Sequence, residues 1–432
     1  MRKLNTRSMQ SILALSAVLL IACSACAQNA GGGLSSCPPV ETGTANSPEQ
    51  KPAFAGQTRA CAVKSSGAFE VTVLATGLNR PWAVEPLPDG GFLVTEKAGQ
   101  MRIISADGQV GEPIDGLLPV DQGGVSAVSG QGGLPPITAR GQGGLLDVAL
   151  SPDFKKDRMI YWSFSEQREG GSGTSVARGK LTANRKKLEQ VRVIFRSMPT
   201  YNNGLHFGSR LAFGPDKKLY LTLGDRFDRG SMRPQAQMLN SHIGKVVRVN
   251  PDGTIPTDNP FVKTEGALPE IWTLGHRNIQ SASFDEKGRL WTIEHGARGG
   301  DELNLIKKGT NYGWPVISYG EEYSGDPIPG GITAKDGLEQ PVYYWDPVIA
   351  PSGAQVYTGK AFPEWRGNIF IGGLASQRLV RLVVKDDRIV GEEHMLTERG
   401  QRIRDVRQGT DGFLYVVTDQ PNGELWRIAP KR

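Results

Sequence analysis

One pattern of apolar and polar residues recurs along the chain from about residue 68 onward. Each copy holds a short β-forming stretch, a turn with Pro, Asp or Gly, and a second stretch rich in β-branched and aromatic residues. The copies lack the 3.6-residue spacing of an amphipathic helix. The pattern therefore predicts six hairpins, with second strands at residues 92–96, 159–164, 219–223, 290–294, 368–372 and 413–419.

A hairpin of this kind cannot bury both of its faces alone, so neighbouring copies must stack. Long repeats built from strands are typical of β-propellers. Six copies predict an all-β fold over residues 67–432, a six-bladed β-propeller with four-stranded antiparallel blades, and outer strands at residues 245–250 and 378–384. The 55 Gly and 28 Pro agree with many tight turns. Two stacked β-sandwiches are the alternative, but they explain the recurrence less well.

Residues 1–22 have the form of a secretion signal. A basic start precedes an apolar run over residues 12–22, which is too short to span a bilayer comfortably. Two processing sites compete: residues 20–23 resemble a bacterial lipobox that would place a lipid anchor on Cys23, and residues 25–27 fit ordinary signal cleavage. We favour the lipobox, and either site predicts export to a periplasm, with membrane contact only through the N-terminal lipid.

The segment after this signal, residues 23–66, is rich in Gly, Ser, Pro and Ala and is predicted to be a flexible tether. All four cysteines precede residue 62, so the propeller has neither thiol chemistry nor a Cys-ligated metal. Cys37 and Cys61 could form a disulfide in an oxidising compartment, or remain two unpaired thiols.

The charge of the chain excludes one class of partner. The formal net charge is +6, and it falls to +3 without residues 1–22, which hold three cations and no acid. The sequence contains no basic run interleaved with aromatic residues. Nucleic acid is therefore not a predicted partner.

Equivalent positions of the six blades form a ring around the axis of a propeller. The entries to the first strands carry Trp82, Gln142, His206, Arg277, Asn278, Ser352, Arg402 and Arg404. The exits of the second strands carry Glu96, Asp225, Glu294 and Asp419. Both sets are expected at one mouth of the ring, because an entry and the adjacent exit lie at the same end of antiparallel strands.

Two kinds of chemistry follow from this ring. His206 beside Asp225 could form a general base that a carboxylate orients, although a histidine in a β-protein is more often structural. Several arginines favour a ligand with carboxylate or phosphate groups. His276 immediately precedes Arg277, and strand alternation should turn it away from the axis.

Calcium is the metal that the sequence favours. The spacings HxH and HExxH of zinc sites do not occur in the sequence. Asp301 and Glu302 follow a Gly-rich turn, whose free carbonyls and adjacent carboxylates are hard oxygen ligands. A solvated acidic turn is the alternative interpretation.

Several of these segments resemble the soluble sugar dehydrogenases that depend on pyrroloquinoline quinone (PQQ), in the aldose sugar dehydrogenase branch. The resemblance extends over about residues 70–428 and includes RGQGGLLDVALSPDF, HFGSRLAFGPDKKLYLTLGD, LGHRNIQSASFD, EHGARGGDELNLIKKGTNYGWP and RIRDVRQGTDGFLYVVTD. It implies a six-bladed propeller with PQQ lying flat across one mouth and calcium beside it. It also implies oxidation of an aldose at C1 to the lactone.

The resemblance implies a role for each site residue. His206 would remove the proton of the sugar C1 hydroxyl while hydride passes to the quinone, and Asp225 would orient His206. Arg277 and calcium would stabilise the developing negative charge. The implied cofactor contacts are Gln142, Arg277, Asn278, Tyr323, Gly373, Leu374, Ala375, Arg402, Ile403 and Arg404. The implied calcium ligands are the carbonyls of Gly296 and Ala297, with a second site at Glu302 and Tyr312.

The chain departs from this family pattern in three places. Many relatives have Pro where this chain has Ala297, a change that a carbonyl ligand tolerates. Some relatives have Lys in the segment that corresponds to residues 373–375, where this chain is apolar, so contacts there would be backbone or dispersive. The Gly-rich loop at residues 120–140 is longer and is expected to alter access to the mouth.

Three functions fit the sequence to different degrees. The predicted one is PQQ- and calcium-dependent oxidation of an aldose, with electrons leaving to a soluble acceptor because no CxxCH haem motif occurs. A calcium-dependent propeller lactonase or other hydrolase would not need Arg402 and Arg404. A non-catalytic glycan-binding propeller would have no use for His206 beside Asp225. The protein is expected to be a monomer or a homodimer.

Overall fold

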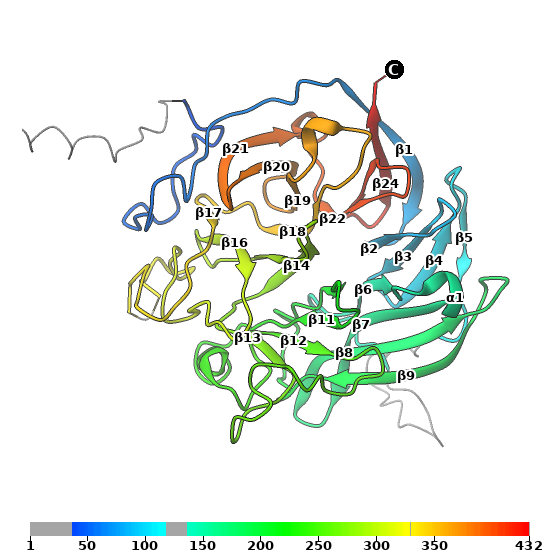
Figure 1. Cartoon of the computed structure of the whole chain (residues 1–432), viewed down its shortest axis with the longest axis horizontal. Helices are drawn as coiled ribbons and strands as arrows, with labels where there is room; N and C mark the ends of the chain where they lie inside the picture. Colours follow the sequence, from blue (N-terminus) through cyan, green and yellow to red (C-terminus); the bar gives the residue numbers. More distant parts are fainter. Residues whose placement is uncertain (1–36, 118–135, 329, 432) are drawn as a thin grey trace, which may run out of the picture. The chain divides into compact units, whose positions relative to one another are not determined.

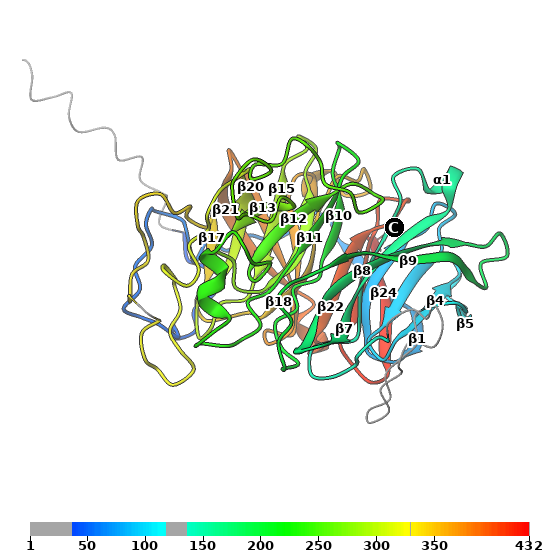
Figure 2. The same cartoon turned by 90° about the horizontal axis from the view of Figure 1, so that it is seen from below.

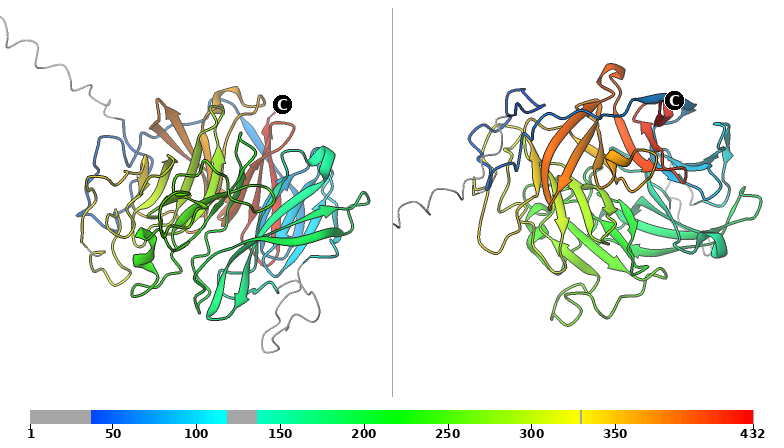
Figure 3. Two further views of the ribbon diagram at one scale, coloured as in Figure 1. Left: turned by 60° about the horizontal axis from the view of Figure 1, so that its bottom comes forward. Right: turned by 45° about the horizontal axis from the view of Figure 1, so that its top comes forward.

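Six four-stranded antiparallel sheets follow one another around a common centre in the computed structural model (Figure 1). The structure describes residues 37–117, 136–328 and 330–431. The sheets are the blades of a propeller, and side and tilted views show them succeeding one another around the ring (Figure 2 and Figure 3). The predicted fold class, blade count and strand number per blade are confirmed.

Each of the first three blades is built from four consecutive strands. Blade 1 contains β2 (Pro81–Pro86), β3 (Phe92–Glu96), β4 (Gln100–Ile104) and β5 (Val110–Pro113). Blade 2 contains β6 (Leu145–Leu150), β7 (Met159–Arg168), β8 (Gly171–Leu181) and β9 (Leu188–Arg196). Blade 3 contains β10 (Leu211–Phe213), β11 (Leu219–Thr222), β12 (Lys245–Val249) and β13 (Ile271–Leu274).

Blades 4 and 5 are also built from four consecutive strands, whereas blade 6 takes its fourth strand from the beginning of the domain. Blade 4 contains β14 (Ile279–Phe284), β15 (Leu290–Glu294), β16 (Asp301–Ile306) and β17 (Tyr343–Trp345). Blade 5 contains β18 (Pro351–Val356), β19 (Ile369–Gly373), β20 (Arg378–Lys385) and β21 (Arg388–Met395). Blade 6 contains β22 (Ile403–Gln408), β23 (Leu414–Thr418), β24 (Gly423–Pro430) and β1 (Phe69–Leu78).

The ring is closed by a strand from the beginning of the domain. β1 pairs with β24 in antiparallel register, from Phe69 opposite Pro430 to Leu78 opposite Gly423. In Figure 1 the blue β1 lies beside the red β24. Closure removes the unpaired sheet edge that β24 would otherwise expose.

The predicted second strands are β3, β7, β11, β15, β19 and β23. Five of them agree with the prediction to within one residue at each end, and β7 extends to Arg168 because it pairs along the whole of β8. Every residue of β3, β15, β19 and β23 is buried. Stacked blades cover both faces of these strands, which explains why most of their residues are apolar.

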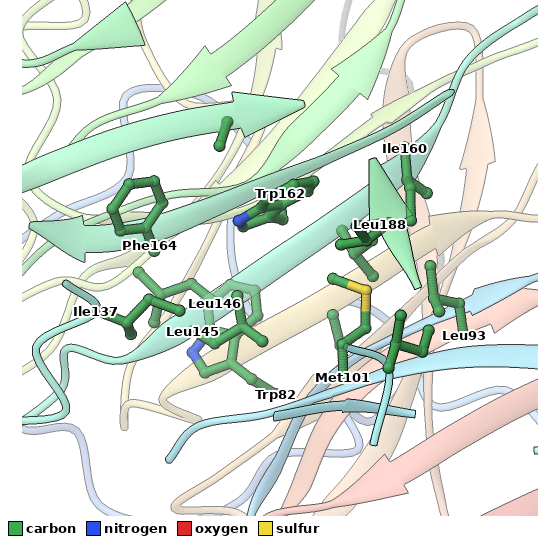
Figure 4. Close-up of a cluster of buried hydrophobic side chains, with 14 of the residues drawn as sticks. Trp82, Leu93, Met101, Ile137, Leu145, Leu146, Ile160, Trp162, Phe164 and Leu188 are labelled. Carbon is green, nitrogen blue, oxygen red and sulfur yellow. The ribbon is translucent and has the colours of Figure 1, made fainter. Parts of the chain in front are cut away.

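The hydrophobic core lies between the blades. Figure 4 shows the cluster that joins blades 1 and 2, in which Trp82 and Leu93 pack with Leu146, Trp162 and Phe164. Helices are short in the described ranges: α1 (Phe154–Asp157) and the 3-10 turns η1 (Arg233–Gln237), η2 (Pro363–Trp365) and η3 (Thr397–Arg399). None of them is long and apolar enough to cross a membrane.

Residues 38–66, which we predicted to be part of a flexible tether, belong to the same compact unit as the propeller. Ala62 forms a parallel bridge with Glu392, and the Ala60 backbone N–H donates to the Tyr343 hydroxyl at 2.9 Å. Buried positions such as Gln57 hold this segment in place. The composition suggested a tether because it is Gly- and Pro-rich, but these contacts are with distant residues that a local pattern does not reveal.

Cys37 and Cys61 are both disulfide-bonded, which agrees with the first of the two predicted states. The predicted signal over residues 1–22 and both processing sites lie outside the described residues. So does most of the predicted loop at residues 120–140, of which only 136–140 are described.

Gln57 tests whether residues 38–66 are part of the folded unit. Its side chain is fully buried, donates to the Pro341 carbonyl at 2.9 Å, and accepts from the Ala53 N–H at 2.7 Å. We expect Gln57→Ala to lower the free energy of unfolding by about 1–3 kcal/mol, because buried partners lose their hydrogen bonds. Urea unfolding measures this change, with Glu49→Gln on the exposed part of the segment as control. Equal stability of both variants would show that the segment does not contribute to the fold.

Candidate functional site

A cavity of about 310 Å³ opens at one end of the propeller axis. All six blades contribute to its wall, so it lies at the convergence of the first strands. Its lining residues include Arg80, Trp82, Lys97, Gln142, Phe207, Gln280, His295, Leu374, Arg402, Arg404 and Asp419. Four of the predicted site residues, Gln142, Leu374, Arg402 and Arg404, are thus brought together at this mouth.

His206 and Asp225 form a buried dyad beside this cavity, next to the lining residue Phe207. Nδ1 of His206 lies 2.6 Å from Oδ1 of Asp225. The same carboxylate accepts from the Phe227 N–H at 2.9 Å and from Nε1 of Trp314 at 2.9 Å. Because Nδ1 is engaged, Nε2 of His206 is the nitrogen left for a substrate.

The backbone around His206 is held in an unusual conformation. Its φ is +47°, in the left-handed region that costs a non-glycine residue free energy. The His206 N–H donates to Oε1 of Gln142 at 2.8 Å, and the imidazole packs edge-on against Phe227 with ring centres 4.9 Å apart. These contacts fix the ring with respect to blade 2 as well as blade 3.

The electrostatics of the dyad favour a neutral imidazole. Burial lowers the pKa of His206, and the charge of Asp225 opposes this effect without overcoming it. Burial also disfavours ionisation of Asp225, but the charge and hydrogen bond of His206 and the charge of Arg277 outweigh it and keep the Asp225 pKa below its usual value. At neutral pH the pair is therefore a neutral base held by a carboxylate.

Arg277 and Asn278 join β13 to β14 next to the dyad. Nη1 of Arg277 donates to the carbonyls of His295, at 3.1 Å, and of Gly296. The guanidinium lies 5.3 Å from the centre of the Trp314 ring. Nε and Nη2 of Arg277 and Nδ2 of Asn278 are buried and have no partner among the described residues. Such donors carry a desolvation cost that a ligand rich in acceptors would remove.

Arg402 and Arg404 share one carboxylate. Both donate to Oδ2 of Asp419, at 2.9 and 3.0 Å. Nε of Arg404 is buried without a partner in the part of the chain that the structure describes. Ile403, between the two, packs in the hydrophobic core between blades 5 and 6, so only its backbone could meet a ligand.

The other predicted cofactor contacts lie at the edge of the cavity or outside it. Leu374 lines the cavity, Gly373 is the last residue of β19, and Ala375 is exposed. Tyr323 does not line the cavity: its side chain is 56% exposed, and its ring lies 6.0 Å from that of Phe227.

The loop after β15 contains the predicted calcium carbonyls. The Gly296 carbonyl accepts from Arg277, so a cation there would have to displace the guanidinium. Ala297 is buried. Asp301 accepts three backbone N–H groups, those of Gly296, Ile349 and Ala350, each at 2.8 Å, and burial raises its pKa to about 6.

Glu302 and Tyr312 are the second predicted pair of metal ligands. The Glu302 carboxylate has a raised pKa, and the Tyr312 hydroxyl is already hydrogen-bonded. Glu302 lies directly opposite Glu294 across β15 and β16, and burial together with the Glu294 charge raises the pKa of Glu302 well above its usual value. The Tyr312 hydroxyl donates to the Leu305 carbonyl at 2.7 Å and accepts from the Lys307 N–H at 2.8 Å. Only the Tyr312 carbonyl would therefore serve a metal. Within residues 37–117, 136–328 and 330–431, no three His, Cys, Asp or Glu side chains are grouped to hold one.

Sequence reasoning missed two residues of the cavity wall by a single position. Lys97 and His295 line the cavity, whereas the predicted exits Glu96 and Glu294 are buried inside the blades. A shift of one residue along a strand exchanges its two faces. A correct strand register would therefore have predicted Lys97 and His295 in place of Glu96 and Glu294. Burial lowers the pKa of His295 to about 3, so this side chain is neutral at neutral pH.

The fold and the site define a six-bladed propeller with a base dyad beside a cationic axial cavity. Residues 78–427 match the sequence profile of the family described as Glucose / Sorbosone dehydrogenase. The chain is 42% identical to aldose sugar dehydrogenase YliI of Escherichia coli over 367 residues, 84% of this chain and 93% of the relative. It is 29% identical to quinoprotein glucose dehydrogenase B of Acinetobacter calcoaceticus, over 81% of this chain and 85% of that protein. The protein belongs to the Glucose / Sorbosone dehydrogenase family.

Solved structures of aldose sugar dehydrogenases have the same fold as this chain. The apo-form crystal structure of the soluble aldose sugar dehydrogenase from E. coli superimposes with a TM-score of 0.76 at 41% identity, covering 84% of this chain and all of that one. The PQQ-bound aldose sugar dehydrogenase from Streptomyces coelicolor does so with a TM-score of 0.65 at 28% identity, with the same coverage.

The protonation state of His206 can be measured directly. We expect NMR of the cofactor-free protein to show Nε2 unprotonated and a titration midpoint below the usual value of about 6.5. Asp225→Asn removes the charge that raises the His206 pKa, so its midpoint should fall further. A midpoint at or above 6.5 in the unaltered protein would contradict this account of the dyad.

Proposed function

We propose that this protein oxidises aldose sugars at C1 to the corresponding lactones, with PQQ and calcium as cofactors. The observation that carries the proposal is the buried dyad of His206 and Asp225 beside a cationic cavity on the axis. The relatives named as aldose sugar and quinoprotein glucose dehydrogenases, and the PQQ-bound neighbour, support the same reaction class.

The residues around the cavity fit PQQ chemically. PQQ has three carboxylates and a pair of quinone carbonyls, all of which accept hydrogen bonds. The buried unpartnered donors are of the complementary kind: Nε and Nη2 of Arg277, Nδ2 of Asn278 and Nε of Arg404. Arg402, Arg404 and Gln142 would hold the cofactor from the cavity wall. Leu374 would contact it through apolar surface, and Tyr323 would approach it from the rim.

The dyad performs the proton chemistry of the reaction. When bound, PQQ supplies the two-electron acceptor for the sugar. His206 accepts the proton of the C1 hydroxyl at Nε2, because Nδ1 is engaged with Asp225. Asp225 keeps the ring orientation and stabilises the imidazolium that results. Arg277 supplies positive charge next to the dyad, on a guanidinium that Trp314 covers on one side.

Calcium would use oxygen atoms of the backbone at both predicted positions. At the first, the carbonyls of Gly296 and Ala297 are available once Arg277 leaves the Gly296 carbonyl. At the second, Glu302 would be the charged ligand. Burial and the Glu294 charge raise its pKa, and a cation bound there would oppose both effects.

The rival functions explain less of the site. Asp419 is the single carboxylate among the described residues that line the cavity, and two arginines already bind it. A hydrolase that holds catalytic calcium with mouth carboxylates would need several. A glycan-binding propeller would not need a buried neutral histidine oriented by a carboxylate. We further propose that the protein is exported and passes its electrons to a soluble acceptor.

Removing the base tests the proposed mechanism. We expect His206→Gln to lower kcat about 10²–10⁴-fold while PQQ affinity changes little, because the variant loses proton transfer and keeps the cavity. Dye-linked aldose oxidation with added PQQ and calcium measures the rate.

The matched control is His242→Gln. His242 is also a buried histidine of blade 3 with a carboxylate partner, Glu270 at 2.8 Å, but it does not line the cavity. His242→Gln should keep kcat within a few fold even where its stability falls. Full activity of His206→Gln would eliminate His206 as the base. Failure of the unaltered protein to oxidise any aldose with both cofactors would eliminate the proposed function.

Calcium removal tests the Glu302 site. We expect chelation to lower the melting temperature, since a ligand present at 100 times its Kd stabilises the fold by about 2.7 kcal/mol. Glu302→Gln should reduce the difference between calcium-loaded and chelated protein, because only the Gly296 and Ala297 position would remain, while the exposed Glu265→Gln keeps the full difference. The stabilisation should increase with pH, because calcium needs ionised Glu302 and the raised pKa keeps this group protonated at lower pH. Identical melting temperatures with and without calcium at every pH would remove Glu302 from the proposal.

A further inference from the structure

The wall of the axial cavity carries more positive charge than the proposed site uses. Arg402 and Arg404 from blade 6 line it together with Arg80 and Lys97 from blade 1. Asp419 is the one carboxylate in the described lining. Four cations and one carboxylate leave three positive charges uncompensated at this mouth.

Arg80 and Lys97 lie next to each other because of the strand register of blade 1. Arg80 immediately precedes β2, Lys97 immediately follows β3, and Pro81 pairs with Glu96. The Lys97 backbone N–H donates to the Arg80 carbonyl at 3.1 Å. Lys97 also donates from Nζ to the Gly141 carbonyl, which directs the ammonium group toward blade 2.

The charges of blade 1 interact with those of blade 6. Burial lowers the pKa of Lys97, and the positive charges of Arg404 and Arg80 lower it further. Asp419 acts in the opposite direction, but it is already shared by the two arginines of blade 6. The four cations therefore repel one another, and an anionic ligand would reduce this repulsion.

Arg80 is exposed at the cavity wall, where its guanidinium can meet a ligand. Its guanidinium has neither a hydrogen bond nor an ion pair within the described ranges. Its φ is +48°, a conformation that glycine adopts without strain and arginine does not. Strained backbone positions cluster at ligand sites, and Arg80 has its strained position at the cavity wall.

We propose that Arg80 and Lys97 bind a carboxylate of PQQ and complete, with Arg402 and Arg404, a cationic wall for its three carboxylates. The assignment rests on the proposed function. Leu374, which lines the cavity from blade 5, offers no charge there. The wall formed by blades 6 and 1 thus receives the carboxylates, and the quinone is directed toward the dyad in blade 3 and Arg277.

The test is the affinity of the full-length protein for PQQ in Arg80→Gly, Lys97→Met and the double variant. Quenching of tryptophan fluorescence reports binding without turnover, since Trp82 lines the cavity. Each single substitution should raise Kd about tenfold and the double about 100-fold, as expected for lost charge-assisted hydrogen bonds. The double variant should also show a weaker dependence of Kd on salt.

Two controls separate this effect from damage to the fold. Lys217 is an exposed lysine in the turn between β10 and β11, and it forms an ion pair with Asp153. The Kd of the Lys217→Met variant for PQQ should be unchanged. Arg80→Gly should melt at or above the temperature of the unaltered protein, because glycine relieves the strained backbone.

The outcomes for the assignment and for the proposed function differ. Kd values within twofold of the unaltered protein in all three variants overturn the assignment and leave the sugar reaction standing. Loss of affinity in the variants, in a protein that oxidises no aldose, supports the cationic wall and overturns the reaction. Absence of PQQ binding by the unaltered protein overturns both. Benzene-1,3,5-tricarboxylate should compete with PQQ, and this competition should require Arg80 and Lys97.

Discussion

The pairing of β1 with β24 is the contact on which the arrangement of this protein depends. It connects the first strand of the domain to the last, so that the six blades form a closed ring. Each blade then has a neighbour on both faces, which allows its second strand to be buried along its whole length. Closure also places blade 1 beside blade 6. Lys97 and Arg404, far apart in the sequence, consequently share one cavity wall.

The ring concentrates polar groups at one mouth and gives them different electrostatic environments. Asp225 is buried, receives hydrogen bonds from His206, Phe227 and Trp314, and orients the imidazole, while burial keeps the imidazole neutral. The wall of blades 6 and 1 is open to ligands and positively charged. The histidine near this charged wall is neutral because burial outweighs the effect of the Asp225 charge, and the charge of Arg277 acts in the same direction as burial.

Much of the fold and part of the site could be predicted from the chain alone. The recurrence of apolar stretches predicts the blade count and the second strands, since a strand that is buried on both faces is mostly apolar. His206 and Asp225 were also predicted to lie together, because both occupy strand ends of one blade. Local pattern could not reveal that residues 38–66 pack on blades 4 and 5, since Ala60 and Gln57 find their partners almost 300 residues away.

The repeating unit, its number and the strand ends at which polar residues gather all follow from the local residue pattern. Only the tertiary structure decided which side chains face the axis, because a shift of one residue exchanges the faces of a strand: Lys97 and His295 line the cavity, and Glu96 and Glu294 do not. It also decided that Arg277 occupies the Gly296 carbonyl and that the Tyr312 hydroxyl is engaged with Leu305. These outcomes depend on distances between blades, which residue spacing along one strand does not contain.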